Sequence, residues 1–314
     1  MKRSAVATVI ATRRSAPRPI GSKLVVDEDG AMEGSVSGGC VESDVYGACR
    51  AILDGEAPRM ITYGITDEQA FSVGLPCGGE IDVFVGAYDA ALYEQIGDRR
   101  AVVYTDLGSG AQRLVFEGED GSTDSLIRGA QSRVVGDTFA DVFGPPPRLL
   151  VFGAIDTGEE LCRAANVLGW RTIVADARGR FATRERIPSA DELLVLWPEE
   201  ALAQVQPDHA TAVVVLTHDD KFDIPAIVGT LETDAFYLGV IGSRRNQERR
   251  REVLLEAGVS EEALERVHGP TGLDIGAHTP AETALSILAE ILAVRAGRSG
   301  GALRGTTQRI HVEV

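Results

Sequence analysis

Three consecutive prolines, Pro145 to Pro147, constrain the fold of this chain more than any other feature of its sequence. Proline lacks an N–H group and has a fixed φ, so a run of three cannot continue a helix or an inner strand. The chain has 314 residues, which is long for one domain. We therefore expect two domains, residues 1–144 and 148–314.

Downstream of the prolines, short apolar segments alternate with helical patterns. The expected strands are Leu149–Phe152, Thr172–Ala175, Leu193–Leu196, Ala212–Thr217 and Phe236–Ile241, and the expected helices are Gly158–Leu168, Arg245–Ala257 and Pro280–Arg295. This alternation predicts a Rossmann-like, doubly wound parallel sheet. The last helix is expected to carry one apolar face, made by Leu285, Leu288, Ile291 and Leu292.

Upstream of the prolines, strand and hairpin patterns dominate. The expected strands are Ala5–Thr12, Lys23–Asp27, Ala31–Ser37, Met60–Tyr63, Ile81–Val85, Ala101–Thr105 and Arg113–Phe116. A helix is expected directly after Cys40, where apolar residues recur at helical spacing. The predicted fold class is therefore α/β, with an N-terminal α+β domain followed by a Rossmann-like domain.

The stretch GSVSGGCVESD, residues 34–44, carries the sharpest chemical signal. Gly38 and Gly39 permit a positive φ, so the backbone beside Cys40 can approach a ligand closely. Cys40 also lies near the expected helix N-terminus, where unpaired amides and the helix dipole favour an anion and lower the pKa of a thiol. Cys40 is thus a candidate soft ligand for a metal or sulfur centre. The alternative is a small, buried cysteine in a tight turn.

A second glycine-flanked cysteine supports the functional interpretation. LPCGGE places Cys77 before Gly78 and Gly79, in mirrored order to the first motif. The other two cysteines, Cys49 and Cys162, lie on the apolar stripes of expected helices. The chain has no C-x-x-C pair and too few cysteines for a disulfide framework, so we expect a reducing cytoplasm and no zinc site.

Charge and hydropathy exclude two classes of partner. A formal net charge of −16 repels nucleic-acid phosphates and anionic lipids, so we expect neither nucleic-acid nor membrane-surface binding. No run of residues approaches the roughly 20 apolar residues that cross a bilayer.

The turn after the first strand of the second domain resembles a dinucleotide-binding turn. Gly153 and Gly158 match its outer glycines, and Asp176 matches the acidic residue that binds ribose hydroxyls. Ile155 replaces the middle glycine, and its side chain is expected to occupy the space where the backbone meets pyrophosphate. The pattern favours the Rossmann fold more strongly than a bound NAD(P).

Two later loops follow expected strands, at the carboxyl edge where open α/β sheets bind ligands. His218 lies among carboxylates. One alternative is that it acts as a base or a ligand, and the other is that a neighbouring carboxylate satisfies its hydrogen-bonding capacity. Arg244 and Arg245 follow Gly242-Ser243 at a helix start and are expected to form a phosphate site facing the cleft between the domains. The alternative for the arginines is a solvated helix face.

Several longer motifs occur in a characteristic order. They are GSVSGGCVE, LPCGGEIDV, LLVFGA, DARGRF, VLTHD, LGVIGSRR and GLDIGAHTPAETALSILAEI. From about Val6 to Arg295 the chain resembles the XdhC/CoxI family, accessory factors of xanthine dehydrogenase and related molybdenum hydroxylases. The resemblance implies an N-terminal domain with the cysteine motif and a C-terminal Rossmann domain.

The resemblance also implies a function. A protein of this family would bind molybdenum cofactor, protect it while a terminal oxo ligand is exchanged for sulfur, and deliver it to the apo-hydroxylase. Expected partners are a molybdenum hydroxylase of the xanthine dehydrogenase type and a sulfurtransferase or cysteine desulfurase, and a homodimer is compatible with the sequence. With Cys40 as the metal ligand, the expected cofactor-binding residues are Gly38, Gly39, Cys40, Glu42, Cys77, Gly78, Gly153, Gly158, Asp176, Arg244 and Arg245.

Two other classes of protein stay open. The first is an NAD(P)-dependent oxidoreductase with His218 or Cys40 as acid or nucleophile, and the missing middle glycine argues against it. The second is a docking module that binds no cofactor, which has no need of two glycine-flanked cysteines. One departure from the family concerns the glycine-rich turn, which commonly reads Gly-Ala-Gly-His and here reads Gly153-Ala154-Ile155-Asp156.

Overall fold

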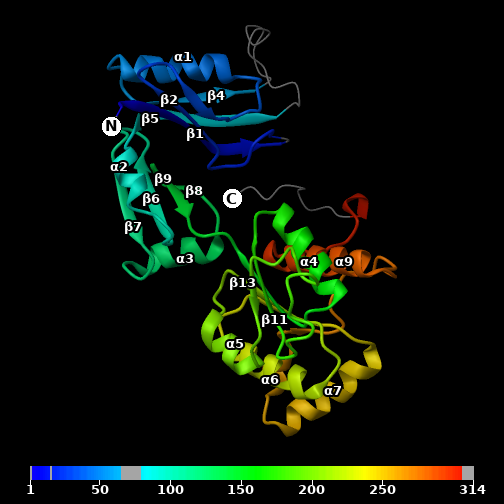
Figure 1. Cartoon of the computed structure of the whole chain (residues 1–314). Coiled ribbons are helices and arrows are strands. Elements are labelled where there is room, and N and C mark those ends of the chain that lie inside the picture. The colour runs from blue at the N-terminus through cyan, green and yellow to red at the C-terminus, as the bar shows by residue number, and fades with distance from the viewer. Residues whose placement is uncertain (1, 15, 65–78, 306–314) are drawn as a thin grey trace. The chain divides into compact units, whose positions relative to one another are not determined.

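The computed structural model describes residues 2–14, 16–64 and 79–305 (Figure 1). The chain divides into two compact units between Pro145 and Pro146, within the run of prolines. Within the described residues, no helix is both long enough and apolar enough to cross a membrane.

The N-terminal unit begins with a five-stranded antiparallel sheet in the order β3-β2-β1-β5-β4. Its strands are β1 (Ser4–Arg13), β2 (Lys23–Asp27), β3 (Met32–Gly34), β4 (Arg59–Tyr63) and β5 (Glu80–Tyr88). Helix α1 (Glu42–Leu53) lies along one face of this sheet (Figure 1). Alternate residues of β1, such as Ala5 and Ala7, pack with Val45 and Cys49 of α1 in one buried cluster.

A second antiparallel sheet of the same unit has the order β7-β6-β9-β8. It comprises β6 (Ala101–Asp106), β7 (Gln112–Phe116), β8 (Arg133–Val135) and β9 (Thr138–Phe143), with helices α2 (Ala90–Glu94) and α3 (Gly121–Gly129). Ile10 of β1 and Phe84 of β5 share a buried cluster with Phe139 of β9. Lys23 of β2 also pairs with the buried Asp141 of β9, so apolar and ionic contacts join the two sheets.

The C-terminal unit is a six-stranded parallel sheet in the order β12-β11-β10-β13-β14-β15. Its strands are β10 (Arg148–Phe152), β11 (Arg171–Ala175), β12 (Glu192–Leu194), β13 (Thr211–Val215), β14 (Tyr237–Val240) and β15 (Val267–His268). In chain order this is the 3-2-1-4-5-6 arrangement of a Rossmann fold, and it confirms the predicted fold class. Ligands of such sheets bind outside the carboxyl ends of the strands, near the turn after β10.

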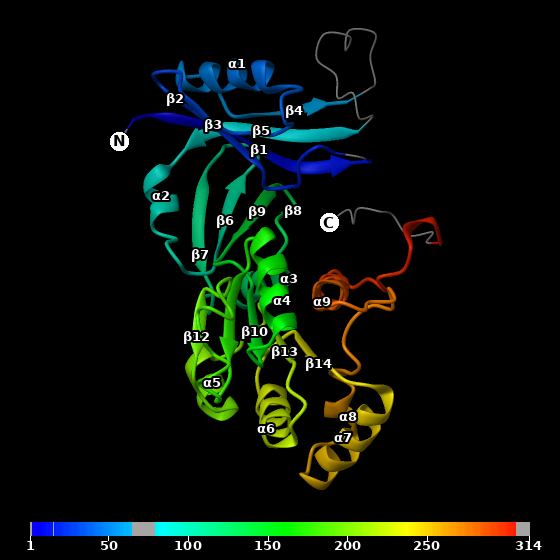
Figure 2. The same cartoon turned by 45° about the vertical axis from the view of Figure 1, so that its right-hand side comes forward.

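Helices cover both faces of the parallel sheet. They are α4 (Asp156–Val167), α5 (Pro198–Val205), α6 (Asp220–Leu231), α7 (Arg244–Glu256), α8 (Glu261–Leu264) and α9 (Pro280–Arg295), followed by the 3-10 turn Leu303–Gly305. One buried cluster joins the sheet to α4 and α9, and another joins it to α5, α6 and α7. Figure 2 shows α5 and α6 beside the strands.

The apolar face of α9 differs from the prediction. Leu288 and Ile291 are buried as expected, but Leu285 is 57% exposed and Leu292 is 38% exposed. The buried stripe instead includes Ala284 and follows helical spacing from there. Leu285 and Leu292 each come one residue after a buried position, about 100° further around the helix, and therefore face away from the core.

Candidate functional site

Cys40 lies in the loop of residues 35–41, hereafter the Cys40 loop, which connects β3 to α1. Its side chain is exposed, so the alternative of a buried cysteine in a tight turn is wrong. Gly38 and Gly39 have φ values of +76° and +115°, and a Cβ on either would meet nothing within 4 Å. These glycines are therefore required by the backbone conformation rather than by lack of space.

The other two described cysteines are buried in the cores of their units, as the sequence predicts. Burial raises the pKa of the Cys49 thiol to about 11 and that of Cys162 to about 12. A protonated, enclosed thiol is a poor nucleophile and metal ligand. Among the described cysteines, the exposed Cys40 is therefore the candidate for soft-ligand chemistry.

The Cys40 loop is organised around the carboxylate of Glu42, the first residue of α1. Gly38 N–H donates to Ser35 Oγ at 2.8 Å, and Cys40 N–H donates to Ser37 Oγ at 2.9 Å. Six further hydrogen bonds end on Glu42, from the hydroxyls of Ser35 and Ser37 and the N–H groups of Val36, Ser37, Gly39 and Val41. We expected unpaired amides here for an external anion, but every N–H group from residue 36 to 41 already has a partner.

These contacts keep Glu42 ionised. Burial of the carboxyl opposes ionisation, but the hydroxyls of Ser35 and Ser37 and the N–H groups of Ser37 and Gly39 outweigh it and lower the pKa of Glu42 to about 2. The loop thus contains its own anion. Glu42, predicted as a cofactor-binding residue, directs its side chain toward the loop that precedes it.

The second cysteine motif is only partly within the described residues, because Cys77 and Gly78 lie outside them. Glu80, the last residue of the motif, pairs with Arg13, which also binds Asp82 at 2.8 Å. In the part of the chain that the structure describes, no three His, Cys, Asp or Glu side chains group as a metal site. Cys40 is therefore a single exposed thiol among the described residues, and its partnership with Cys77 stays a prediction.

At the carboxyl edge of the Rossmann sheet, the predicted glycine turn has close backbone contacts. A Cβ on Gly158 would lie 2.9 Å from the carbonyl oxygen of Gly153, and a Cβ on Gly153 would lie 3.1 Å from Thr217 Cγ2. Both glycines thus allow the turn to pack against its neighbours. Ile155 is half-buried and packs against the core, whereas we expected its side chain in front of the turn.

Asp176 follows β11, where a dinucleotide-binding protein holds ribose hydroxyls. Here the buried carboxylate already accepts hydrogen bonds from Ala154 N–H at 3.0 Å and from Arg178 Nε and Nη2 at 2.9 and 2.7 Å. Burial opposes ionisation of Asp176, but Arg178 and Ala154 outweigh it and lower its pKa. A hollow lined in part by Gly153, Asp176 and Phe222 has a volume of about 10 Å³, room for roughly one water molecule.

The arginine run at the start of α7 separates into two groups. Arg244 and Arg245 are exposed at the first two helical positions, after the N-cap Ser243, and make no ion pair with the described residues. The other three pair with acidic residues, as Arg249 with Asp220, Arg250 with Asp223 and Arg251 with Glu261. A solvated helix face therefore does not describe the whole run.

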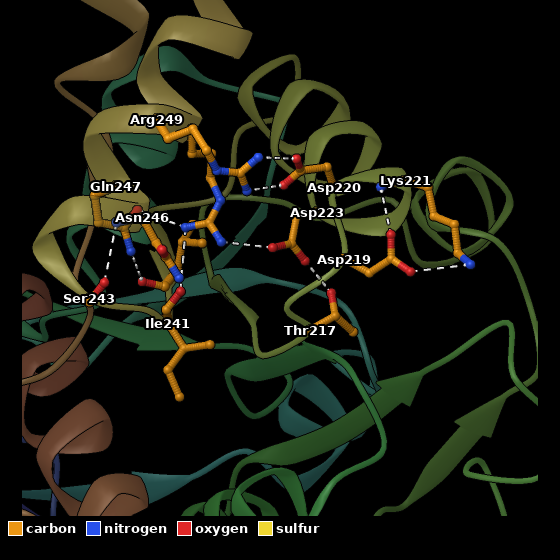
Figure 3. Close-up of polar contacts among 12 residues, drawn as sticks. Thr217, Asp219, Asp220, Lys221, Asp223, Ile241, Ser243, Asn246, Gln247 and Arg249 are labelled. Carbon is orange, nitrogen blue, oxygen red and sulfur yellow. Dashed lines mark hydrogen bonds and ion pairs between the residues drawn. The ribbon is translucent and has the colours of Figure 1, made fainter.

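Arg250 differs most from a residue on a solvated helix face, since it is only 3% exposed. It donates to the fully buried Asp223 at 2.7 Å and to Gln247 Oε1 at 2.8 Å. Asp223 also accepts a hydrogen bond from Thr217, which follows β13 (Figure 3). This network therefore links the turn after β13 to the first turns of α7.

His218 stands in the same turn but outside this network. It is exposed and makes no hydrogen bond or ion pair with the described residues. Its neighbour Asp219 instead pairs with Lys221 at 3.2 Å (Figure 3). When His218 is charged, it opposes the burial that raises the pKa of Asp223, so both alternatives for His218 stay predictions.

Sequence reasoning missed the roles of Arg178, Asp223 and Arg250. Arg178 could have been found, because an arginine two residues after the acidic position can fold back onto it. The Asp223–Arg250 pair joins residues 27 positions apart on two helices, so no local sequence pattern predicts it.

Comparisons with known proteins agree with this architecture. The model of the XdhC Rossmann domain matches residues 149–291, and that of the XdhC and CoxI family matches residues 2–64. The chain is 30% identical over 298 residues to the molybdenum cofactor insertion chaperone PaoD of Escherichia coli (strain K12), covering 94% of this chain and 84% of PaoD. The chain belongs to the XdhC and CoxI family.

Two further similarities extend over nearly the whole chain. It is 28% identical over 312 residues to a probable xanthine dehydrogenase subunit of Bacillus subtilis (strain 168), with 92% of each chain covered. A crystal structure described as a xanthine dehydrogenase from Bacillus halodurans superposes with a TM-score of 0.70 at 24% identity, covering 98% of this chain and 94% of the other. The solved structure shows that this XdhC and CoxI family member shares its fold over both units.

Proposed function

We propose that this protein binds molybdenum cofactor and delivers it to a molybdenum hydroxylase of the xanthine dehydrogenase type. The observation that carries the proposal is the exposed Cys40 thiol on a fully hydrogen-bonded loop in a member of the XdhC and CoxI family. The kinship with PaoD, described as a molybdenum cofactor insertion chaperone, supports it. The cofactor is here cargo, held and passed on.

Cys40 suits the metal end of this cargo. A thiolate is a soft ligand, and soft ligands suit molybdenum and sulfur centres. Hydrogen bonds within the chain hold the Cys40 loop, because its N–H groups donate to Glu42 and to two serine hydroxyls. Binding therefore costs little additional ordering of the loop. Cys77, when its thiol reaches the same cargo, would supply a second soft ligand.

Arg244 and Arg245 suit the phosphate end of the cargo. In a chain with 47 acidic and 31 basic residues, these two guanidinium groups have no acidic partner among the described residues. They stand at the N-terminus of the 13-residue helix α7, where the dipole and free amides favour an anion. Guanidinium groups bind phosphate through paired hydrogen bonds. These arginines are therefore our candidate phosphate site within the Rossmann unit.

The finer steps follow from this assignment. While Cys40 holds the cofactor, a sulfurtransferase or cysteine desulfurase, with a reductant that brings its persulfide sulfur to sulfide, would replace the terminal oxo ligand, whose oxygen would leave as water, and the hydroxylase would then receive the cofactor. A homodimer is part of the same proposal. NAD(P) binding is disfavoured, because Arg178 and Ala154 already bind the carboxylate of Asp176 that would meet the ribose.

Anaerobic purification of the chain from cells that make molybdenum cofactor tests the proposal. Mass spectrometry and metal analysis of the same sample separate bound pterin, bound dinucleotide and empty protein. We expect pterin and molybdenum in matching amounts. Protein that carries NAD(P) and no molybdenum would support the oxidoreductase alternative instead.

A further inference from the structure

The loop that carries the exposed Cys40 is hydrogen-bonded to the half-buried side chain of Glu42. Both oxygens of the Glu42 carboxylate are used. Oε1 accepts from Ser35 Oγ at 2.6 Å and from Ser37 N–H at 2.8 Å, and Oε2 accepts from Gly39 N–H at 2.8 Å. The carboxylate therefore occupies the position that an external anion takes in other loops rich in N–H donors.

The two serines extend the reach of Glu42 to the remaining amides. Ser35 Oγ donates to Glu42 and accepts from Gly38 N–H at 2.8 Å, while Ser37 Oγ donates to Glu42 and accepts from Cys40 N–H at 2.9 Å. A chain of hydrogen bonds thus runs from the charged carboxylate through Ser37 to the backbone of Cys40. Loss of the charge at Glu42 weakens each link in this chain.

We propose that Glu42 is the positioning residue for Cys40, because its carboxylate orders the loop that presents the thiol. That this thiol receives molybdenum cofactor rests on the proposed function, but the positioning role is a property of the empty chain. Glu42 itself makes no contact with the cofactor in this assignment. The amides of the Cys40 loop likewise offer no site for a second anion.

Asp44 provides a matched control. It lies in the same first turn of α1 and is also acidic, but its carboxylate binds the hydroxyl of Tyr63 instead of the Cys40 loop. Asp44→Asn thus removes the same charge from the helix N-terminus and leaves the loop contacts intact. Any difference between Glu42→Gln and Asp44→Asn then reports the loop contacts rather than the helix dipole.

Amide hydrogen exchange of residues 36–41 in the empty chain tests the proposal. A charge-assisted hydrogen bond corresponds to roughly ten- to a hundredfold in an equilibrium constant, so we expect Glu42→Gln to accelerate this exchange by about that factor. Glu42→Asp keeps the charge on a side chain one methylene shorter and should be intermediate. Asp44→Asn should match wild type at these amides.

A nitroxide attached to Cys40, in chains that carry Cys77→Ser, adds a spectroscopic readout. We expect an immobilised spectrum in wild type and in Asp44→Asn, and a mobile component in Glu42→Gln. Unchanged exchange and an unchanged spectrum in Glu42→Gln would overturn the positioning role. Because neither measurement uses cofactor, a failure of the proposed function leaves a different signature, namely an ordered loop in a chain that binds no pterin.

Discussion

Removal of Arg250 should destabilise the Rossmann unit strongly, because it leaves Asp223 as a buried, unpaired carboxylate. The side chain of Arg250 is 4% exposed and that of Asp223 is fully buried. Breaking a buried ion pair on one side costs about 3–5 kcal/mol. With a urea m-value of about 2 kcal/mol/M, Arg250→Met should lower the unfolding midpoint by roughly 1.5–2.5 M.

The neighbouring Arg251 supplies the control. It pairs with Glu261 on the surface, where both side chains are more than half exposed. Such pairs contribute about 0–1 kcal/mol, so Arg251→Met should shift the midpoint by less than about 0.5 M. Replacing both members of the buried pair, as Arg250→Met with Asp223→Leu, should recover most of the loss, because no buried charge remains.

The assay is urea denaturation followed by tryptophan fluorescence. Both tryptophans of the chain, Trp170 and Trp197, belong to the C-terminal unit, so the signal reports that unit alone. Equal midpoints for Arg250→Met and Arg251→Met would refute the reasoning, since they would show that Asp223 is not left unpaired in a dry site.

Three further predictions concern other parts of the chain. The folded pKa of Glu42 lies below its ordinary value, so its contribution to stability is present above about pH 4.5 and is lost as pH falls toward 2; Glu42→Gln should flatten the acid limb of a stability profile of the N-terminal unit. Cys162→Ala should cost about 1 kcal/mol in the fluorescence assay and leave cofactor retention unchanged, because the thiol is buried in the core and is not part of the proposed site. Arg178→Ala should release Asp176 and allow calorimetric detection of NAD(H), which wild type should not bind.

Much of the architecture follows from the sequence by local rules. Strands such as Lys23–Asp27 and the helix Pro280–Arg295 have the predicted bounds, because period, caps and prolines are short-range signals. The parallel pairing of the C-terminal strands follows from their alternation with helices, but their order in the sheet does not, because other doubly wound orders alternate in the same way. The sequence predicts less well which residues of a helix face the core. Leu285 illustrates this, since a rotation of the helix by one residue exchanges buried and exposed leucines.

The sequence identifies the residues of the Cys40 loop as candidates, but it does not predict their contacts. The motif around Cys40 predicts a glycine-rich turn. No local sequence pattern predicts that the side chain of Glu42 turns back and accepts the hydrogen bonds of this turn. Likewise, five arginines in ten residues look equivalent in the sequence. Tertiary contacts with α6 and α8 separate them, because acidic partners on those helices lie within reach of three and not of Arg244 and Arg245.

An equilibrium titration with isolated cofactor tests whether Cys40 holds molybdenum cofactor. Isolated cofactor is added anaerobically to wild type, Cys40→Ser and Cys77→Ser, and bound pterin is measured after rapid separation. We predict at least about tenfold weaker binding by Cys40→Ser, as expected for loss of one strong ligand interaction of about 1.4 kcal/mol or more. Equal affinity of wild type and Cys40→Ser would contradict the account.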